Sequence, residues 1–99
     1  MIISHRGRKT GERENSIAAF ERAFEMGAEG IECDARLTKD EKVILHHDAS
    51  IKKDGRKIVI QRSNLADIFQ FCGEEKPITS IDLFKYIEQK KLPFFIEVK

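Results

Sequence analysis

The stretch IECDAR, residues 31–36, decides how this chain of 99 residues folds. Small or apolar residues alternate in it with charged ones, and successive side chains of a β-strand point to opposite faces of a sheet. The stretch therefore predicts a strand with one apolar face and one face that carries Glu32 and Asp34. Two carboxylates on one strand face repel each other unless a cation lies nearby. Either Arg36 neutralises them on a solvated face, or they belong to a binding site.

Strand and helix patterns alternate on both sides of this stretch. Residues 1–4 form a short apolar run, and Asn15 or Ser16 can cap a helix that follows. Apolar residues recur along that helix at helical spacing, and Gly27 is a natural end for it. LPFFIEVK, residues 92–99, predicts a further strand. Strands separated by helices predict βαβ units with a parallel sheet, so the fold class that we expect is α/β.

A hairpin is predicted directly after the central strand. LTKDEKVILHHD, residues 37–48, indicates that the strand continues, turns at residues 40–41 and returns. A turn with two central residues sets Asp34 opposite His47 across the antiparallel pair. A slip of one residue would bring His46 there instead.

Two more helices are predicted after the hairpin, each from apolar residues at helical spacing. The first carries on one face Leu65, Ile68, Phe69 and Cys72. The second follows Thr79 or Ser80 as its cap and carries on one face Ile81, Phe84 and Ile87. With no repeat and no linker, residues 1–99 are interpreted as one domain.

The composition excludes several classes of protein. A hydrophobic content of 40%, a charged content of 35% and a formal net charge of +1 are ordinary for a globular domain and leave no basic footprint for nucleic acid. No apolar run is long enough to span a membrane, and the amino terminus lacks the pattern of a signal peptide, so we expect a cytoplasmic protein. Cys33 and Cys72 fit no metal spacing and are expected to be buried thiols.

The ends of three predicted strands carry the residues that can perform chemistry. His5 lies just beyond the first strand, Glu32 and Asp34 lie on the second, and Glu97 and Lys99 lie at the end of the last. The carboxyl ends of parallel strands lie side by side, and ligands bind at that edge. Clustered carboxylates suit a hard divalent cation such as Ca²⁺ or Mg²⁺, which favours the binding-site reading.

Several motifs together resemble a known family. They are HRG at residues 5–7, ENS at 14–16, AF at 19–20, GAEGIECDARLTKD at 27–40, HHD at 46–48 and IEVK at 96–99. In order and spacing they resemble the glycerophosphodiester phosphodiesterases. The resemblance implies the amino-terminal portion of a phospholipase-C-like TIM (β/α)8 barrel. Because such a barrel takes about 250 residues, 99 residues supply about three of its strands and leave its carboxy-terminal half absent.

The resemblance also implies a reaction, the hydrolysis of glycerophosphodiesters to glycerol 3-phosphate and an alcohol. His5 and His47 match the two histidines that share general acid and base duties in the family. Imidazole suits that task because it titrates near neutral pH. Asp48 either orients a neighbouring histidine or begins a turn.

A metal site and a phosphate site follow from the same resemblance. Glu32, Asp34 and Glu97 match the ligands of one divalent cation, Ca²⁺ or Mg²⁺. Arg6 and Lys99 match residues that hold the phosphate, for which guanidinium and ammonium donors are suited. The partner is therefore expected to be a small-molecule glycerophosphodiester.

Some residues depart from the family pattern. Arg13 stands where the family has Pro, Glu41 stands where it has Gly, and residues 51–62 lack its Thr-rich continuation. Two alternatives stay open: an enzyme like phospholipase D with a related barrel, and a non-catalytic interaction module.

The incomplete barrel leads to a prediction about the isolated chain. An open barrel leaves unpaired strand edges and leaves apolar side chains uncovered, among them Phe94, Phe95 and Ile96. We therefore expect residues 1–99 alone to be unstable or to self-associate through these edges, and to have negligible activity.

Overall fold

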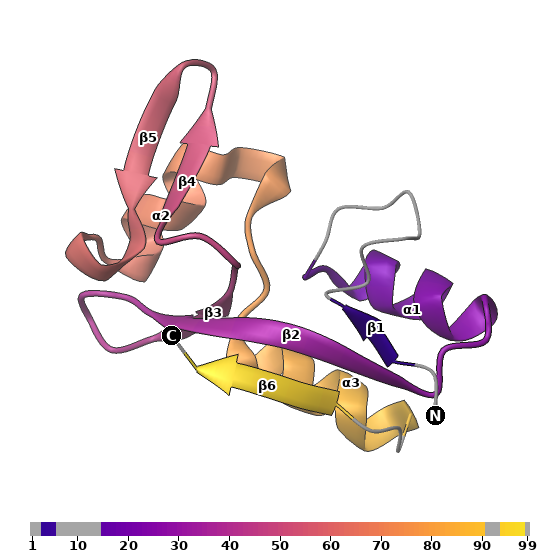
Figure 1. The fold of residues 1–99 in the computed structure, drawn as a ribbon. Helices are drawn as coiled ribbons and strands as arrows, with labels where there is room; N and C mark the ends of the chain where they lie inside the picture. Colours follow the sequence, from indigo (N-terminus) through magenta and orange to yellow (C-terminus); the bar gives the residue numbers. More distant parts are fainter. Residues whose placement is uncertain (1–2, 6–14, 91–93, 99) are drawn as a thin grey trace.

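The computed structural model describes residues 3–5, 15–90 and 94–98, which form both strands and helices (Figure 1). Side chains are described at these positions except at residues 4, 5, 97 and 98. The elements are β1 (Ile3–His5), α1 (Ile17–Glu25), β2 (Gly30–Leu37), β3 (Val43–Leu45), β4 (Ser50–Lys53), β5 (Arg56–Val59), α2 (Leu65–Cys72), α3 (Ser80–Lys90) and β6 (Phe94–Val98), with 3₁₀ turns η2 (Ile60–Arg62) and η3 (Gly73–Glu75).

The strand β2 is the centre of the main sheet. It pairs in parallel with β1 and with β6, and antiparallel with β3. β6 lies along residues 31–35 of β2, whereas β1 lies along residues 30–32 and β3 along residues 35–37. β1 and β3 therefore share one edge of β2 and β6 occupies the other, as Figure 1 shows. The predicted α/β class with a parallel sheet is confirmed.

Helices α1 and α3 cover the apolar face of β2. The residues buried between them and the sheet are Phe20, Ala23, Ile31, Cys33, Ala35, Leu45, Leu83 and Tyr86. The ring of Phe94 on β6 makes edge contacts with the rings of Phe20, Phe24 and Tyr86. The alternation predicted for residues 31–36 is thus observed, and Phe94 is packed against the core rather than uncovered. Phe95 and Ile96 are exposed, as expected.

The ends of α1 are formed by the residues that the sequence indicates. The hydroxyl oxygen of Ser16 accepts a hydrogen bond from the Ala19 N–H, which makes Ser16 the N-cap. Gly27 follows the last turn with a φ of +99°, a conformation that favours glycine.

The buried face of α3 differs from the predicted one. Leu83 and Tyr86 face the core, whereas Ile81 and Phe84 are 64% and 57% exposed. The helix carries two apolar stripes at helical spacing, and spacing alone does not decide which of them meets the sheet. The cap is as predicted, because Thr79 Oγ1 and Asp82 are reciprocally hydrogen-bonded.

The segment between β3 and α3 forms a small second layer with its own apolar cluster. The cluster consists of Ile44 of β3 together with Ile60, Ile68 and Cys72 of this segment. The β4–β5 hairpin of this segment is not predicted by the sequence reasoning above. Its turn is formed by Asp54 and Gly55, both at positive φ, which is a turn typical of two-residue hairpins.

Candidate active site

The sheet register brings four of the predicted site positions next to one another. His5 of β1 pairs with Glu32 of β2, and Asp34 of β2 pairs with Glu97 of β6. These are neighbouring backbone positions, and adjacent strands lie about 4.8 Å apart. The side chains of His5 and Glu97 lie outside the described residues, as do Arg6 and Lys99 entirely. For these four residues the predicted roles stay predictions.

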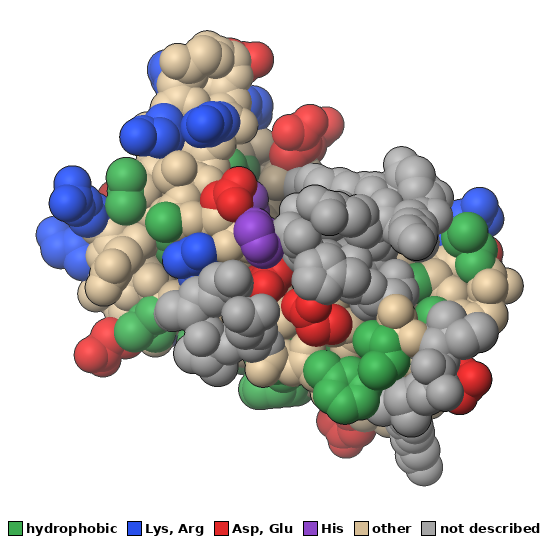
Figure 2. Space-filling view, viewed as in Figure 1, with side chains coloured by type: hydrophobic (Ala, Val, Ile, Leu, Met, Phe, Trp, Pro, Cys, Tyr) green, Lys and Arg blue, Asp and Glu red, His purple; other side chains and the backbone are tan. Residues whose placement is uncertain are grey.

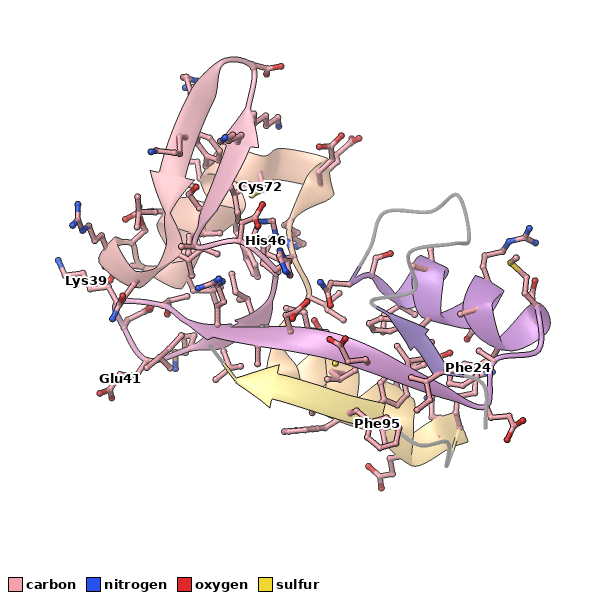
Figure 3. The ribbon with its side chains drawn as sticks, viewed as in Figure 1. Phe24, Lys39, Glu41, His46, Cys72 and Phe95 are labelled. Atoms are coloured by element: carbon pink, nitrogen blue, oxygen red, sulfur yellow. The ribbon has the colours of Figure 1, made fainter. Side chains whose placement is uncertain are left out.

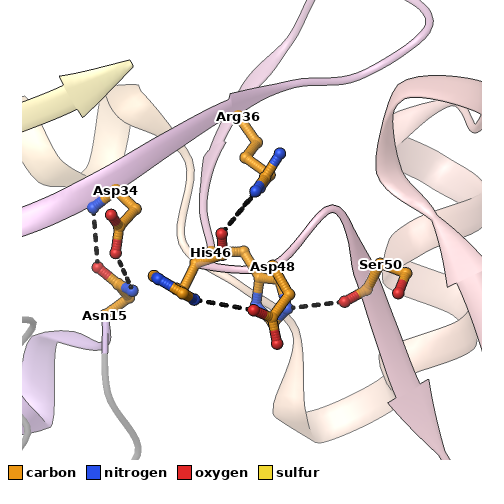
Figure 4. Close-up of polar contacts among 7 residues, drawn as sticks. Asn15, Asp34, Arg36, His46, Asp48 and Ser50 are labelled. Carbon is orange, nitrogen blue, oxygen red and sulfur yellow. Dashed lines mark hydrogen bonds and ion pairs between the residues drawn. The ribbon is translucent and has the colours of Figure 1, made fainter. Parts of the chain in front are cut away.

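Asn15 is a site residue that the sequence reasoning assigned only as a helix cap. Its Nδ2 donates to Asp34 Oδ2 at 3.3 Å, and its Oδ1 accepts from the Asp34 N–H at 3.2 Å (Figure 4). β1 pairs with residues 30–32 of β2 and β3 pairs with residues 35–37 along the same edge. The Asn15 amide binds the backbone of β2 between these two strands. Asn15 and Asp34 are both buried, and Asp34 is only 1% exposed. The available signal was the ENS motif at residues 14–16, whose middle residue can serve as more than a cap.

The register of the β2–β3 hairpin differs from the predicted count. Thr38 N–H donates to the Lys42 carbonyl, so the loop has three residues, 39–41, and not two. Glu41, at the tip of this turn in Figure 3, has a φ of +63°, which is the conformation that closes such a loop. The extra loop residue shifts the pairing, and the His46 N–H donates to the Asp34 carbonyl at 3.1 Å. The predicted pairing of Asp34 with His47 is wrong.

The two adjacent histidines nevertheless have different partners. His46 donates from Nε2 to the Ser50 carbonyl at 3.1 Å, a contact that fixes the loop before β4. His47 contacts the Asp48 carboxylate through Nδ1 at 2.8 Å. A carboxylate only accepts hydrogen bonds, so Nδ1 of His47 carries the proton and Nε2 is the nitrogen that can accept one. No described residue hydrogen-bonds this Nε2.

Arg36 fixes the backbone that carries His47. Its Nε and Nη2 both donate to the His47 carbonyl, at 3.1 and 2.7 Å. The loop that bears the two histidines is therefore attached to β2 twice, through the Asp34 carbonyl and through the Arg36 side chain. In Figure 2 a histidine side chain lies between carboxylates on this face of the molecule.

The electrostatics of this part of β2 favour a cation. Burial, and to a smaller extent the charges of Asp34 and Glu32, raise the pKa of the Cys33 thiol to about 12. The hydrogen bond from His47 lowers the pKa of Asp48, so Asp48 is a carboxylate at neutral pH.

The donor set fits a hard divalent cation in its chemistry. Glu32 and Asp34 supply carboxylate oxygens from one strand, and the register places Glu97 beside Asp34. Among the described side chains, no group of three His, Cys, Asp or Glu residues lies close enough to hold a metal ion. In the same part of the chain, no helix is long and apolar enough to cross a membrane.

Comparison with known proteins gives a consistent result. Residues 5–94 match the profile of the Glycerophosphoryl diester phosphodiesterase family. A glycerophosphodiester phosphodiesterase of Caldanaerobacter subterraneus subsp. tengcongensis is 36% identical over 110 residues, which covers 100% of this chain and 45% of the relative. A lysophospholipase D of Rattus norvegicus is 45% identical over 51 residues, which covers 52% of this chain and 16% of the relative.

Solved structures agree with the sequence comparison. The crystal structure of a glycerophosphodiester phosphodiesterase from Thermotoga maritima superposes with a TM-score of 0.84 at 31% identity and covers 99% of this chain and 43% of that chain. The chain thus spans less than half the length of the proteins that it matches throughout. The predicted fold, the amino-terminal portion of a TIM barrel, is confirmed.

Proposed function

Because the chain belongs to the glycerophosphoryl diester phosphodiesterase family, we propose that the protein containing it hydrolyses glycerophosphodiesters to glycerol 3-phosphate and an alcohol. The observation that carries the proposal is the arrangement on β2. This strand bears Glu32 and Asp34 on one face and holds, through Arg36, the loop that presents His47.

His47 is proposed as one of two general acid–base groups. Phosphodiester hydrolysis needs one group to take a proton from the attacking oxygen and another to give a proton to the leaving alkoxide as the P–O bond breaks. The contact of Nδ1 with Asp48 leaves Nε2 of His47 for such a transfer. His5, whose backbone lies beside Glu32, is proposed as the second group.

The acids are proposed as ligands of one divalent cation, Ca²⁺ or Mg²⁺. Glu32, Asp34 and Glu97 would hold it, and when bound it would stabilise negative charge on the phosphate oxygens. The chain's own contribution is the orientation of Asp34. The Asn15 amide contacts both the backbone and the carboxylate of this residue, so the carboxylate is held before any ion binds. Arg6 and Lys99 are proposed to hold the phosphate.

Lysophospholipase D activity is a second candidate. One relative with that name shares 45% identity with this chain over 51 residues, although it is matched along only 16% of its length. The same bond type would be cleaved, with an acyl chain retained on the glycerol. The two candidates differ in substrate and not in the residues that act.

The test measures product release with two kinds of substrate. Residues 1–99 are assayed alone and joined to the carboxyl-terminal part of the Caldanaerobacter relative, of which this chain spans 45%. Glycerophosphocholine and glycerophosphoethanolamine should release glycerol 3-phosphate from the joined protein, and lysophosphatidylcholine tests the second candidate. The isolated chain should have negligible activity.

Variants decide which residues act. His47→Ala should lower kcat by about 10²–10⁴-fold, the range typical for loss of a general acid–base group, while His46→Ala should lower it less. Asp34→Asn removes a proposed ligand of the cation and should lower turnover by weakening metal binding. Chelation of divalent cations should abolish turnover. A joined, folded protein that releases no product from any of the three substrates would identify the chain as part of a non-catalytic module.

A further inference from the structure

The β4–β5 hairpin pairs like charges across its two strands. Lys52 lies directly opposite Lys57, and Lys53 lies directly opposite Arg56. Like charges at directly opposite positions destabilise a hairpin. Each pair therefore needs a compensating interaction, and the two faces of the hairpin differ in this respect.

The cations on the inner face have partners in α2 and at its end. Lys53 Nζ donates to the Cys72 carbonyl at 2.9 Å. The Arg56 guanidinium lies over the Phe71 ring, 5.5 Å from its centroid, which is a favourable cation–π distance. Packing of the hairpin on α2 thus accounts for Lys53 and Arg56.

The cations on the outer face of the hairpin, which points away from α2, have no stabilising partner among the described residues. Lys52 and Lys57 are exposed, and neither makes a hydrogen bond or an ion pair with any residue that the structure describes. Lys and Arg side chains gather on the hairpin in Figure 2. Side chains at directly opposite positions of a hairpin are neighbours, so the two ammonium groups can bind one anion between them. An ammonium is a strong donor to phosphate oxygens.

Lys52 also connects the hairpin to the candidate active site. It lines a cavity of about 180 Å³ together with Asn15 and His46. Asn15 contacts the Asp34 carboxylate, so one wall of this cavity belongs to the proposed catalytic arrangement. The remaining walls are formed by Leu45, Ile51, Glu75 and Pro77.

We propose that Lys52 and Lys57 bind a phosphate carried by the leaving alcohol of the substrate. The preferred substrates are then diesters whose alcohol part itself bears a phosphate. This inference rests on the proposed function, since it assigns the alcohol side of that reaction. The scissile phosphate would lie at Asp34 and the second phosphate at the hairpin, with the cavity between them. Glu75 also lines the cavity, and a carboxylate there disfavours an anion on its side.

The test is a binding measurement on the full chain, without turnover. The ¹⁵N-labelled chain is titrated with glycerophosphoglycerol, whose alcohol part is neutral, and with bis(glycerophospho)glycerol, which adds one phosphate. We expect the second probe to bind about 3- to 10-fold more tightly, a range that two exposed ion pairs supply. The shifts should centre on residues 50–59, and the advantage should decrease at high salt.

Matched variants locate the effect. Lys52→Met and Lys57→Met should each reduce the advantage of the doubly charged probe, and the double variant should abolish it. Lys85→Met, at an exposed lysine of α3, should leave it unchanged. Glu75→Gln should increase it, because one opposing charge is removed.

Three outcomes would overturn the inference. The first is equal binding of the two probes by the unmodified chain. The second is tighter binding of the doubly charged probe that persists in the double variant. The third is that the lysine variants lose binding to phosphatidylglycerol vesicles while their preference between the probes is unchanged. The last outcome would assign the pair to a lipid surface. A protein that discriminates between the probes yet hydrolyses nothing would instead contradict the proposed function and leave this site standing.

Discussion

Removal of the Asn15 amide should destabilise the chain more than a loop residue usually does. Asn15 has a φ of +56° and is buried, and it makes two hydrogen bonds to Asp34. Asn15→Gly removes both hydrogen bonds but keeps the backbone conformation accessible. Asn15→Ala removes the same hydrogen bonds and adds the cost of a left-handed conformation for a residue with a Cβ.

The size of the effect follows from the two contacts. A hydrogen bond to a charged group contributes about 1.5–3 kcal/mol, and a buried N–H that loses its acceptor costs about 1–3 kcal/mol. Both contacts of Asn15 are long, at 3.3 and 3.2 Å, so the lower half of each range applies. We expect a loss of about 2.5–4 kcal/mol for Asn15→Gly and about 1 kcal/mol more for Asn15→Ala.

A third variant gives the effect a pH dependence. Asn15→Asp keeps an acceptor for the Asp34 N–H but places a second carboxylate about 3.3 Å from Asp34 Oδ2. Two carboxylates so close share one proton, and the pKa of the pair in the folded chain rises above the ordinary value of about 4. A raised folded-state pKa gives stability that is present below pH 4 and is lost as the pH rises through that pKa. We expect the variant to be about 1–3 kcal/mol less stable at pH 7 than at pH 4, relative to the unmodified chain.

Two measurements check this set of variants. Urea unfolding at pH 4 and pH 7 gives the free energies, and hydrogen exchange of the Asp34 amide reports on the local contact. That amide should exchange faster in Asn15→Gly and in Asn15→Ala. If both variants lose less than about 0.5 kcal/mol and the exchange rate is unchanged, the assigned role of Asn15 is incorrect.

Three more predictions concern single residues. Cys33, whose pKa is raised to about 12 by burial and by the neighbouring carboxylates, should resist iodoacetamide at pH 8 until urea is added, and modification of the folded chain in a mass spectrum would contradict this. Glu41→Gly should stabilise the chain by about 1 kcal/mol in urea unfolding because Glu41 has a φ of +63°, whereas Glu41→Ala should not, and equal effects would disprove the strain argument. In the unmodified chain the bond from His47 lowers the pKa of Asp48, so its contribution to stability is present above about pH 4 and is lost as the pH falls through the lowered value. His47→Ala should return the Asp48 pKa toward its ordinary value in an NMR titration, and an unchanged pKa would show that another group causes the shift.

The sequence predicts the central strand because its pattern has one physical explanation. Alternation over residues 31–36 assigns one face to the core and the other to polar chemistry, and the structure has this arrangement on β2. The caps of α1 are predicted for the same reason, since Ser16 and Gly27 each suit one backbone position better than most other residues. Alternation and capping preferences predict these elements because each depends only on residues close together in the sequence.

The hairpin register is not predicted because it depends on one unusual residue. A three-residue loop needs its last residue in the left-handed region, and Gly or Asn is the residue that normally indicates it. This chain has Glu41 there, so the sequence favours a two-residue turn and the pairing of Asp34 is displaced by one position. The β4–β5 hairpin, in contrast, has a clear turn signal in the sequence. Asp54-Gly55 is a dipeptide typical of two-residue hairpin turns, and both residues have positive φ.

The contact between Asn15 and Asp34 is beyond local rules altogether. The two residues are 19 positions apart, and their pairing depends on β1 ending before β3 begins along the same edge of β2. The lengths of β1 and β3, and not their compositions, leave the Asp34 backbone accessible to the Asn15 amide.

The candidate active site and the layer that contains the β4–β5 hairpin depend on β2 to different degrees. The acids and the histidine loop are attached to this strand, through the Asp34 carbonyl and Arg36, so a change in β2 would displace them together. The hairpin that carries Lys52 packs instead on a separate apolar cluster with α2. Substitutions on its outer face are therefore expected to change the proposed choice of alcohol without moving the carboxylates. This separation is physically the reason to expect substrate preference to change at residues 50–59 while the reaction itself stays with β2.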